Sequence, residues 1–233
     1  MKLKFKLALI ATLAAFSSVA SAIKVDNLAH LVNTDGSLKI GDKVFSDFSF
    51  VNDNLSGFDP ASIQVKASRI NKVYYLSWGG NISIASTDSE TPAIGDLLLK
   101  YTVTAKHRIR EIDQSYTGAV SNGIGSASIA ETVKNGGGAV VATSILALDD
   151  LSDPFAEPGD DLTIIPAGFV LHVTKDINLG ILANPGQLGV TTISQVEQSF
   201  HQNHKVPDGG ASASLLGIAL LGLAMIRRKM GAL

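Results

Sequence analysis

The sequence predicts an all-β domain, a two-layer antiparallel β-sandwich, between a basic, apolar leader and an apolar, basic tail. Short runs suited to strands recur along the chain, and Gly, Asn, Asp and Pro separate them. Helical patterns long enough for parallel crossovers are missing. The segment 23–200 is long enough for one such domain with a sizeable core, and a jelly roll is one topology that the pattern permits.

The first 22 residues have the composition of a secretory signal peptide. Lysines at positions 2, 4 and 6 precede an apolar stretch from Leu7 to Val19. Ala20 and Ala22 supply the small residues that a signal peptidase needs at its cleavage site. The mature chain is therefore expected to begin near Ile23, and the domain after this leader is expected to be exported.

About ten or eleven strands are predicted in the exported segment. One run, from Val25 to Val32, has a pattern that suits a short helix instead. The glycine pair at 79 and 80 is expected to turn a hairpin, and the glycines at 136–138 to form a flexible turn. The strand runs are 44–50, 63–67, 73–78, 81–84, 97–105, 108–116, 126–133, 139–148, 162–165, 170–177 and 190–200.

Four aromatic residues could stack on a sugar if they are exposed: Tyr74, Tyr75, Trp78 and Tyr101. Tyr74 and Tyr75 must point to opposite faces of one strand, and Trp78 shares the face of Tyr74 if that strand is regular. Two interpretations stay open. The rings form a platform for carbohydrate, or they fill the core of the sandwich.

Composition excludes several kinds of chemistry. The segment 23–205 has 13 Lys and Arg against 20 Asp and Glu, a net charge of −7, which argues against nucleic acid or anionic lipid as a partner. The chain has no cysteine, so disulfides, thiol catalysis and cysteine metal sites are ruled out. Sequence motifs for a nucleophile elbow, a phosphate loop or a zinc protease are missing, so we expect a non-catalytic protein without a cofactor.

One acidic stretch is a candidate for Ca²⁺, because it offers the oxygen ligands that this ion prefers. Its spacing does not match an EF-hand, and a solvated loop that repels itself is the alternative. The five histidines are scattered and are expected to be solvated, two of them at or near a tether over 201–210. The candidate calcium ligands are Asp149, Asp150, Asp153, Asp160 and Asp161.

The C-terminal tail has three parts in a fixed order: a turn-forming motif, an apolar run over 211–226, and a basic end over 227–233. Proline and glycine in the motif leave an accessible turn or strand for a processing enzyme. As a single transmembrane helix the run would span about 24 Å of a core of about 30 Å, and snorkelling basic residues would close most of the gap. The motif is Val206, Pro207, Asp208, Gly209 and Gly210, and the basic residues, expected in the cytoplasm, are Arg227, Arg228 and Lys229.

This tail resembles a PEP-CTERM-type sorting domain in its Val-Pro-Asp-Gly/Ser-Gly variant. The resemblance implies an exosortase-type membrane protease or transpeptidase that reads the motif, cleaves there, and releases or transfers the protein to the cell surface or extracellular matrix. Asp208 and Gly209 stand where the commonest form has Glu and Pro. A GlyGly-type signal read by a rhomboid-like protease is the alternative, and Pro207 and Asp208 favour the exosortase.

Stretches 40–50, 173–177 and 193–200 also resemble parts of ectodomains that carry this type of signal, which implies a β-sandwich exoprotein of unassigned activity. Two functions stay open. The first is a non-catalytic surface or matrix protein linked to exopolysaccharide or biofilm. The second is a carbohydrate-binding or carbohydrate-active sandwich, which an exposed aromatic strip beside paired carboxylates in a cleft would favour.

Overall fold

The computed structural model describes residues 23–148 and 159–202. They form ten β-strands and one short helix, and every strand pair is antiparallel, as predicted. The elements are β1 (Ile23–Asn27), α1 (Leu28–Asn33), β2 (Leu38–Ile40), β3 (Lys43–Asp53), β4 (Gln64–Ile70), β5 (Val73–Ser86), β6 (Ala93–Ser121), β7 (Gly123–Asn135), β8 (Val140–Leu148), β9 (Gly159–Ala183) and β10 (Gly189–His201).

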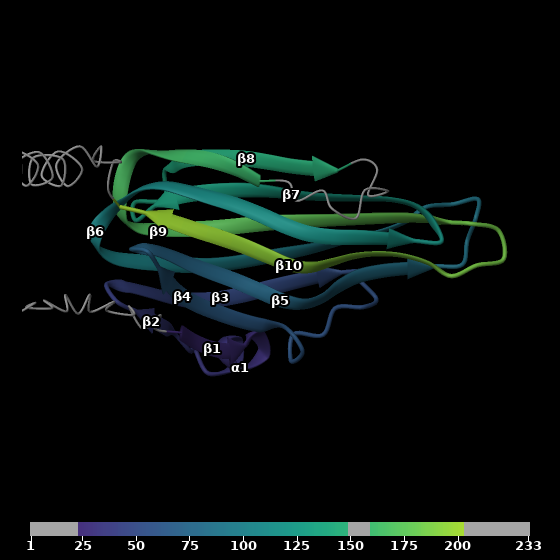
Figure 1. The fold of residues 1–233 in the computed structure, drawn as a ribbon, viewed down its shortest axis with the longest axis horizontal. Helices are drawn as coiled ribbons and strands as arrows, with labels where there is room; N and C mark the ends of the chain where they lie inside the picture. Colours follow the sequence, from purple (N-terminus) through teal and green to yellow (C-terminus); the bar gives the residue numbers. More distant parts are fainter. Residues whose placement is uncertain (1–22, 149–158, 203–233) are drawn as a thin grey trace, which may run out of the picture.

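The strands form two packed layers, and the long strands β6 and β9 each contribute to both of them (Figure 1). The first sheet has the order β2, β3, the N-terminal half of β6, the C-terminal half of β9, β7 and β8. The second has the order β1, β4, β5, β10, the C-terminal half of β6 and the N-terminal half of β9. The register of β6 against β9 shifts between Thr104 and Glu111, where both strands pass from one sheet to the other.

The core lies between the two sheets and is built around aromatic rings. Trp78 of the second sheet lies 5.2 Å from Tyr101 of the first, between ring centroids. Phe45 of the first sheet lies 5.2 Å from Phe200 of the second. Tilted rings at these separations are favourable beyond the area that they bury. The sandwich is therefore held by packing across the layers.

Helix α1 forms where a helix was predicted, although it is shorter than the predicted run. Its N-cap is Asn27, whose side chain accepts a hydrogen bond from the His30 N–H at 2.7 Å. Leu28 and Leu31 are buried and fix the helix to the sandwich. The segment up to and including the cap, Ile23–Asn27, pairs with β4 as a strand instead.

The hairpin predicted at Gly79 and Gly80 is wrong, because β5 runs through both residues. The register of β5 against β10 shifts at this point, so that Ser194 of β10 stands opposite an extra residue of β5. A Cβ atom on Gly80 would lie 2.7 Å from the Ile63 side chain. The glycines therefore accommodate a bulge and a close approach rather than a turn.

Other strand predictions place the elements but cut the long strands short. The runs 97–105 and 108–116 belong to β6, and the runs 162–165 and 170–177 belong to β9. Lys106 and His107 interrupt the strand pattern of β6, and Pro166 and Gly168 interrupt that of β9. The glycines at 136–138 do form the turn between β7 and β8, with a φ of +84° at Gly138.

Among the described residues, no helix is long and apolar enough to cross a membrane. The predicted leader over 1–22 and the predicted span over 211–226 both lie outside the described residues.

Candidate functional site

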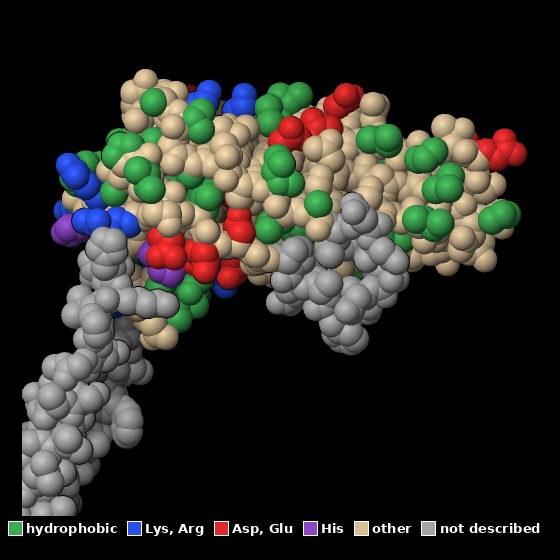
Figure 2. Space-filling view, turned by 90° about the horizontal axis from the view of Figure 1, so that it is seen from above, with side chains coloured by type: hydrophobic (Ala, Val, Ile, Leu, Met, Phe, Trp, Pro, Cys, Tyr) green, Lys and Arg blue, Asp and Glu red, His purple; other side chains and the backbone are tan. Residues whose placement is uncertain are grey.

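Two hollows lie next to each other on the outer face of the second sheet, with volumes of about 400 and 350 Å³. They share Tyr75 and Glu197, so we treat them as one feature, the sheet groove, which crosses β4, β5, β10, β6 and β9. Figure 2 shows acidic side chains gathered beside a histidine on one face of the molecule. The polar lining of the groove includes Lys66, Asp113, Gln195, Glu197, Ser199 and His201.

Strand β10 places these polar groups because it lies at the centre of the second sheet. Its alternate residues from Gln195 to His201 line the groove, while Val196 and Phe200 between them are fully buried. Pairing on both sides fixes the neighbours: Ser199 stands opposite Tyr75 of β5 and opposite Asp113 of β6. The groove is therefore built on rigid strands.

Three side chains in the groove bind one another. The Ser199 hydroxyl donates to Asp113 Oδ2 at 2.7 Å, and the same carboxylate oxygen lies 2.7 Å from His201 Nε2. Ser199 Oγ and His201 Nε2 are 2.8 Å apart. In a catalytic triad the histidine uses one ring nitrogen for the acid and the other for the serine. Here His201 Nε2 contacts both Ser199 and Asp113, so the three side chains form a hydrogen-bonded cluster and not a triad that activates the serine.

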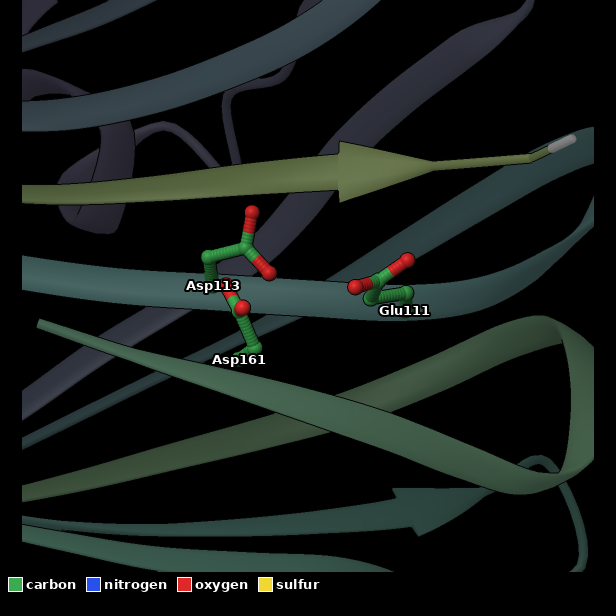
Figure 3. A group of neighbouring side chains, drawn as sticks. All are labelled: Glu111, Asp113 and Asp161. Carbon is green, nitrogen blue, oxygen red and sulfur yellow. The ribbon is translucent and has the colours of Figure 1, made fainter. Parts of the chain in front are cut away.

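A group of carboxylates lies at the edge of this cluster. Glu111, Asp113 and Asp161 each offer an oxygen within 4.8 Å of the others, and Figure 3 shows them projecting from neighbouring β6 and β9. Asp113 and Asp161 stand directly opposite each other, an arrangement that is unfavourable for like charges unless something compensates them. Three oxygens are fewer than the roughly six to eight that Ca²⁺ takes.

Of the predicted calcium ligands, the structure describes two, and they point to different environments. Asp161 belongs to the carboxylate group just described. Asp160 Oδ1 accepts a hydrogen bond from the backbone N–H of Gln114 at 3.1 Å. Asp149, Asp150 and Asp153 lie outside the described residues.

Tyr75 is the one aromatic residue of the predicted platform that lies in the groove. Tyr74, Trp78 and Tyr101 are at most 4% exposed, so they fill the core, and the expectation that Tyr74 and Tyr75 face opposite ways is confirmed. Burial, together with the carboxylates of Glu197 and Asp113, raises the pKa of Tyr75. Its hydroxyl is therefore a neutral donor at physiological pH.

Sequence reasoning missed the cluster of Asp113, Ser199 and His201. The three residues come from two strands, and sequence order does not show that β10 pairs with the C-terminal half of β6. A signal was present in β10, where polar residues at 195, 197, 199 and 201 alternate with residues that face inward. His201, predicted as the first residue of a solvated tether, is the last residue of this strand.

A family model for the VPDSG-CTERM motif matches residues 205–230. The chain therefore carries a PEP-CTERM-type C-terminal sorting signal, as the tail predicted, and such a signal marks an exported protein that a membrane exosortase-type enzyme processes. The match includes the motif from Val206 to Gly210 and the basic residues at 227–229. A comparison with curated proteins finds no match.

Solved structures with partial likeness include several that concern carbohydrates. TmCBM61 in complex with β-1,4-galactotriose has 10% identity and a TM-score of 0.32, covering 66% of this chain and 89% of that one. A structure described as CBM4 has 9% identity and a TM-score of 0.27, covering 65% and 86%. Arthrobacter globiformis T6 isomalto-dextranase complexed with panose has 11% identity and a TM-score of 0.31, covering 67% of this chain and 34% of the enzyme. This chain thus spans about a third of the enzyme, and likeness at these scores carries no argument about ligand or activity.

Proposed function

We propose that this protein is exported by its leader, held in the membrane by the run 211–226, and cleaved at Val206–Gly210 by an exosortase-type enzyme. The folded domain is then delivered to the cell surface or extracellular matrix, where it serves as a non-catalytic structural or adhesive module associated with exopolysaccharide. The sorting signal at 205–230 carries this proposal. The shared use of one His201 nitrogen by Ser199 and Asp113 supports a non-catalytic role.

The position of the signal fits this route. Strand β10 ends at His201, so only four residues separate the last strand from the motif that begins at Val206. Cleavage within the motif would leave every described strand in the released part. The product would keep its fold, because the core residues all precede the cleavage point.

The intact mass and both termini of the protein from the surface or medium of its native host test this route. We expect an N-terminus at Ile23 and a C-terminus between Val206 and Gly210. A Pro207→Ala variant should retain its tail, while the matched Pro185→Ala variant should be processed normally. A native protein that keeps Arg227–Lys229 would be an ordinary single-span membrane protein and would refute the proposal.

The sheet groove favours carbohydrate binding as a second candidate function. It combines one aromatic ring, Tyr75, with amide, hydroxyl and carboxylate side chains on a rigid sheet face. Rings stack on the apolar faces of sugars while such polar groups satisfy sugar hydroxyls. Because Asp113, Asp161 and Glu197 make the groove acidic, we expect a neutral polymer rather than an anionic one.

Affinity electrophoresis of the purified chain in gels that contain neutral or anionic polysaccharides tests this second function. Tyr75→Ala should weaken retention by a neutral polymer about tenfold, the equivalent of ~1.4 kcal/mol. Phe169→Ala is the matched control, because Phe169 is 47% exposed and does not line the groove. Equal loss in both variants, or no retention of the unmodified chain by any polymer, would contradict the groove as a glycan site.

A further inference from the structure

A polar cluster lies between the two sheets. Lys175 of β9 and Glu131 of β7 are cross-strand partners in the first sheet, both side chains are fully buried, and Lys175 Nζ forms an ion pair with Glu131 Oε2. Gln114 projects into the same space from the second sheet and is 2% exposed. Its Oε1 accepts a hydrogen bond from Lys175 Nζ at 2.8 Å. An amine, a carboxyl group and a primary amide therefore meet in one buried space.

Burial changes the protonation of the two ionisable groups. It lowers the pKa of Lys175, with Glu131 acting in the opposite direction, and it raises the pKa of Glu131, with Lys175 opposing. For both groups burial is the largest cause, and it shifts the amine and the acid towards their neutral forms. A neutral amine carries the lone pair that a nucleophile requires.

The amide of Gln114 is placed as the electrophile. Its carbonyl carbon is one bond of about 1.23 Å away from the oxygen that Lys175 contacts. The terminal torsion of a glutamine side chain is broad, so a rotation of the amide about Cγ–Cδ can present the face of the carbonyl group to Nζ. The Gln114 Nε2 donates to Ser144 Oγ at 2.6 Å, which holds the leaving nitrogen on the side away from the lysine.

We propose that Lys175 and Gln114 form an intramolecular isopeptide bond. The Lys175 Nζ attacks Gln114 Cδ, the Nζ–Cδ bond forms, and the Cδ–Nε2 bond breaks. Glu131 gives its proton to the departing Nε2 and takes the proton that Nζ loses, so it ends the reaction as it began. Ammonia leaves, and no oxidant or reductant is involved. Glu131 Oε1 is buried beside Gln198 and is not the oxygen that Lys175 contacts, so it can carry the transferred proton.

The bond would join the two sheets directly. Gln114 and Lys175 are 61 residues apart in sequence, and they belong to opposite layers of the sandwich. An exported protein commonly gains such a staple from a disulfide, and this chain has no cysteine. The isopeptide bond supplies the same constraint on the unfolded chain, and reductants cannot break it.

Mass spectrometry of the purified full chain tests the proposal. We expect the intact mass to be about 17 Da below the sequence value, the mass of one ammonia. Peptide mapping should find a branched peptide that joins the segments around residues 114 and 175. The full sequence mass would overturn the proposal. A loss of about 18 Da, which would place the bond on the Glu131 carboxyl group, would overturn the assignment to Gln114.

Variants separate this reaction from other losses of ammonia. Lys175→Met should restore the full mass, and Glu131→Gln should slow the loss, since its side chain cannot relay the proton. Lys43→Met is the matched control, because Lys43 is also fully buried but pairs with Asp42, and it should keep the loss. Succinimide formation at the Asn-Gly pairs that begin at 122 and 135 also releases ammonia. If the loss of mass persists in Lys175→Met, it comes from these pairs, and the cross-link is refuted. If a variant does not fold, the mass and the branched peptide of the unmodified chain still decide the question.

Discussion

Replacing Asp96 by asparagine should stabilise the protein at neutral pH and remove part of its pH dependence. Asp96 lies on the outer face of the first sheet, opposite Asp53 of β3 and near Asp176 of β9. Burial and, after it, the hydrogen bond and charge of Asp176 raise the pKa of Asp96 from 3.8 to about 6. The folded protein therefore binds this proton more tightly than the unfolded chain does.

The size and sign of the effect follow from this shift. A change from 3.8 to about 6 would correspond to at most ~3 kcal/mol, and because Asp96 is partly exposed, solvent screening reduces this to ~1 kcal/mol. Below the unfolded pKa of about 3.8 both states are protonated and nothing is lost. As the pH rises through about 6, the folded state must give up a proton that it holds favourably, so the free energy of unfolding falls.

Urea unfolding followed by tryptophan fluorescence at several pH values between about 4 and 8 measures this effect. Asp96→Asn should be ~1 kcal/mol more stable than the unmodified protein at the upper end, and the difference should vanish at the lower end. Asp53→Asn is the control, because the charge of Asp53 is the smallest contribution to the shift and its removal should have a smaller effect. A difference that is independent of pH, or a less stable Asp96→Asn at neutral pH, would refute the reasoning.

Three other outcomes are expected. Trp78→Ala should lower the free energy of unfolding by ~3–5 kcal/mol, because a large buried side chain is lost from the centre of the core. Because Trp78 is the single tryptophan of the chain, urea unfolding of this variant and of the unmodified protein is followed by circular dichroism, and a loss below ~1 kcal/mol would contradict that placement. Gly41→Ala should cost ~1–3 kcal/mol, since φ is +58° and a Cβ would lie 2.8 Å from Tyr74 Oη. Gly79→Ala should cost less, because a Cβ there meets nothing within 4 Å. Differential scanning fluorimetry compares the two variants, and equal thermal midpoints would argue against the close contact at Gly41. A chain that ends at residue 205 should have the same thermal midpoint as the full chain in the same fluorimetric assay, and a lower midpoint would mean that the tail contributes to the fold.

Local sequence patterns predicted the elements of the sandwich well where each strand stays in one sheet. The run 190–200 became β10, and the run 126–133 became the centre of β7. They failed at Gly79 and Gly80, where two glycines look like a turn but accommodate a bulge against Ile63. They also divided β6 and β9, because the break in alternation at a crossing between sheets resembles the end of a strand. Both errors have one cause, since a glycine or a polar residue reports a local deviation but not the partner that requires it.

The sequence by itself determined the sorting signal, the antiparallel all-β class and the opposite orientation of Tyr74 and Tyr75. These depend on residues that are neighbours in the chain, so short-range order is enough to define them. Tertiary structure alone decided the sheet groove and the buried cluster of Lys175, Glu131 and Gln114. Each brings together side chains from strands that are tens of residues apart, and their meeting depends on which strands pair and on how β6 and β9 pass between the sheets. Pairing of distant strands is settled by packing of the whole core, and no local run of residues encodes it.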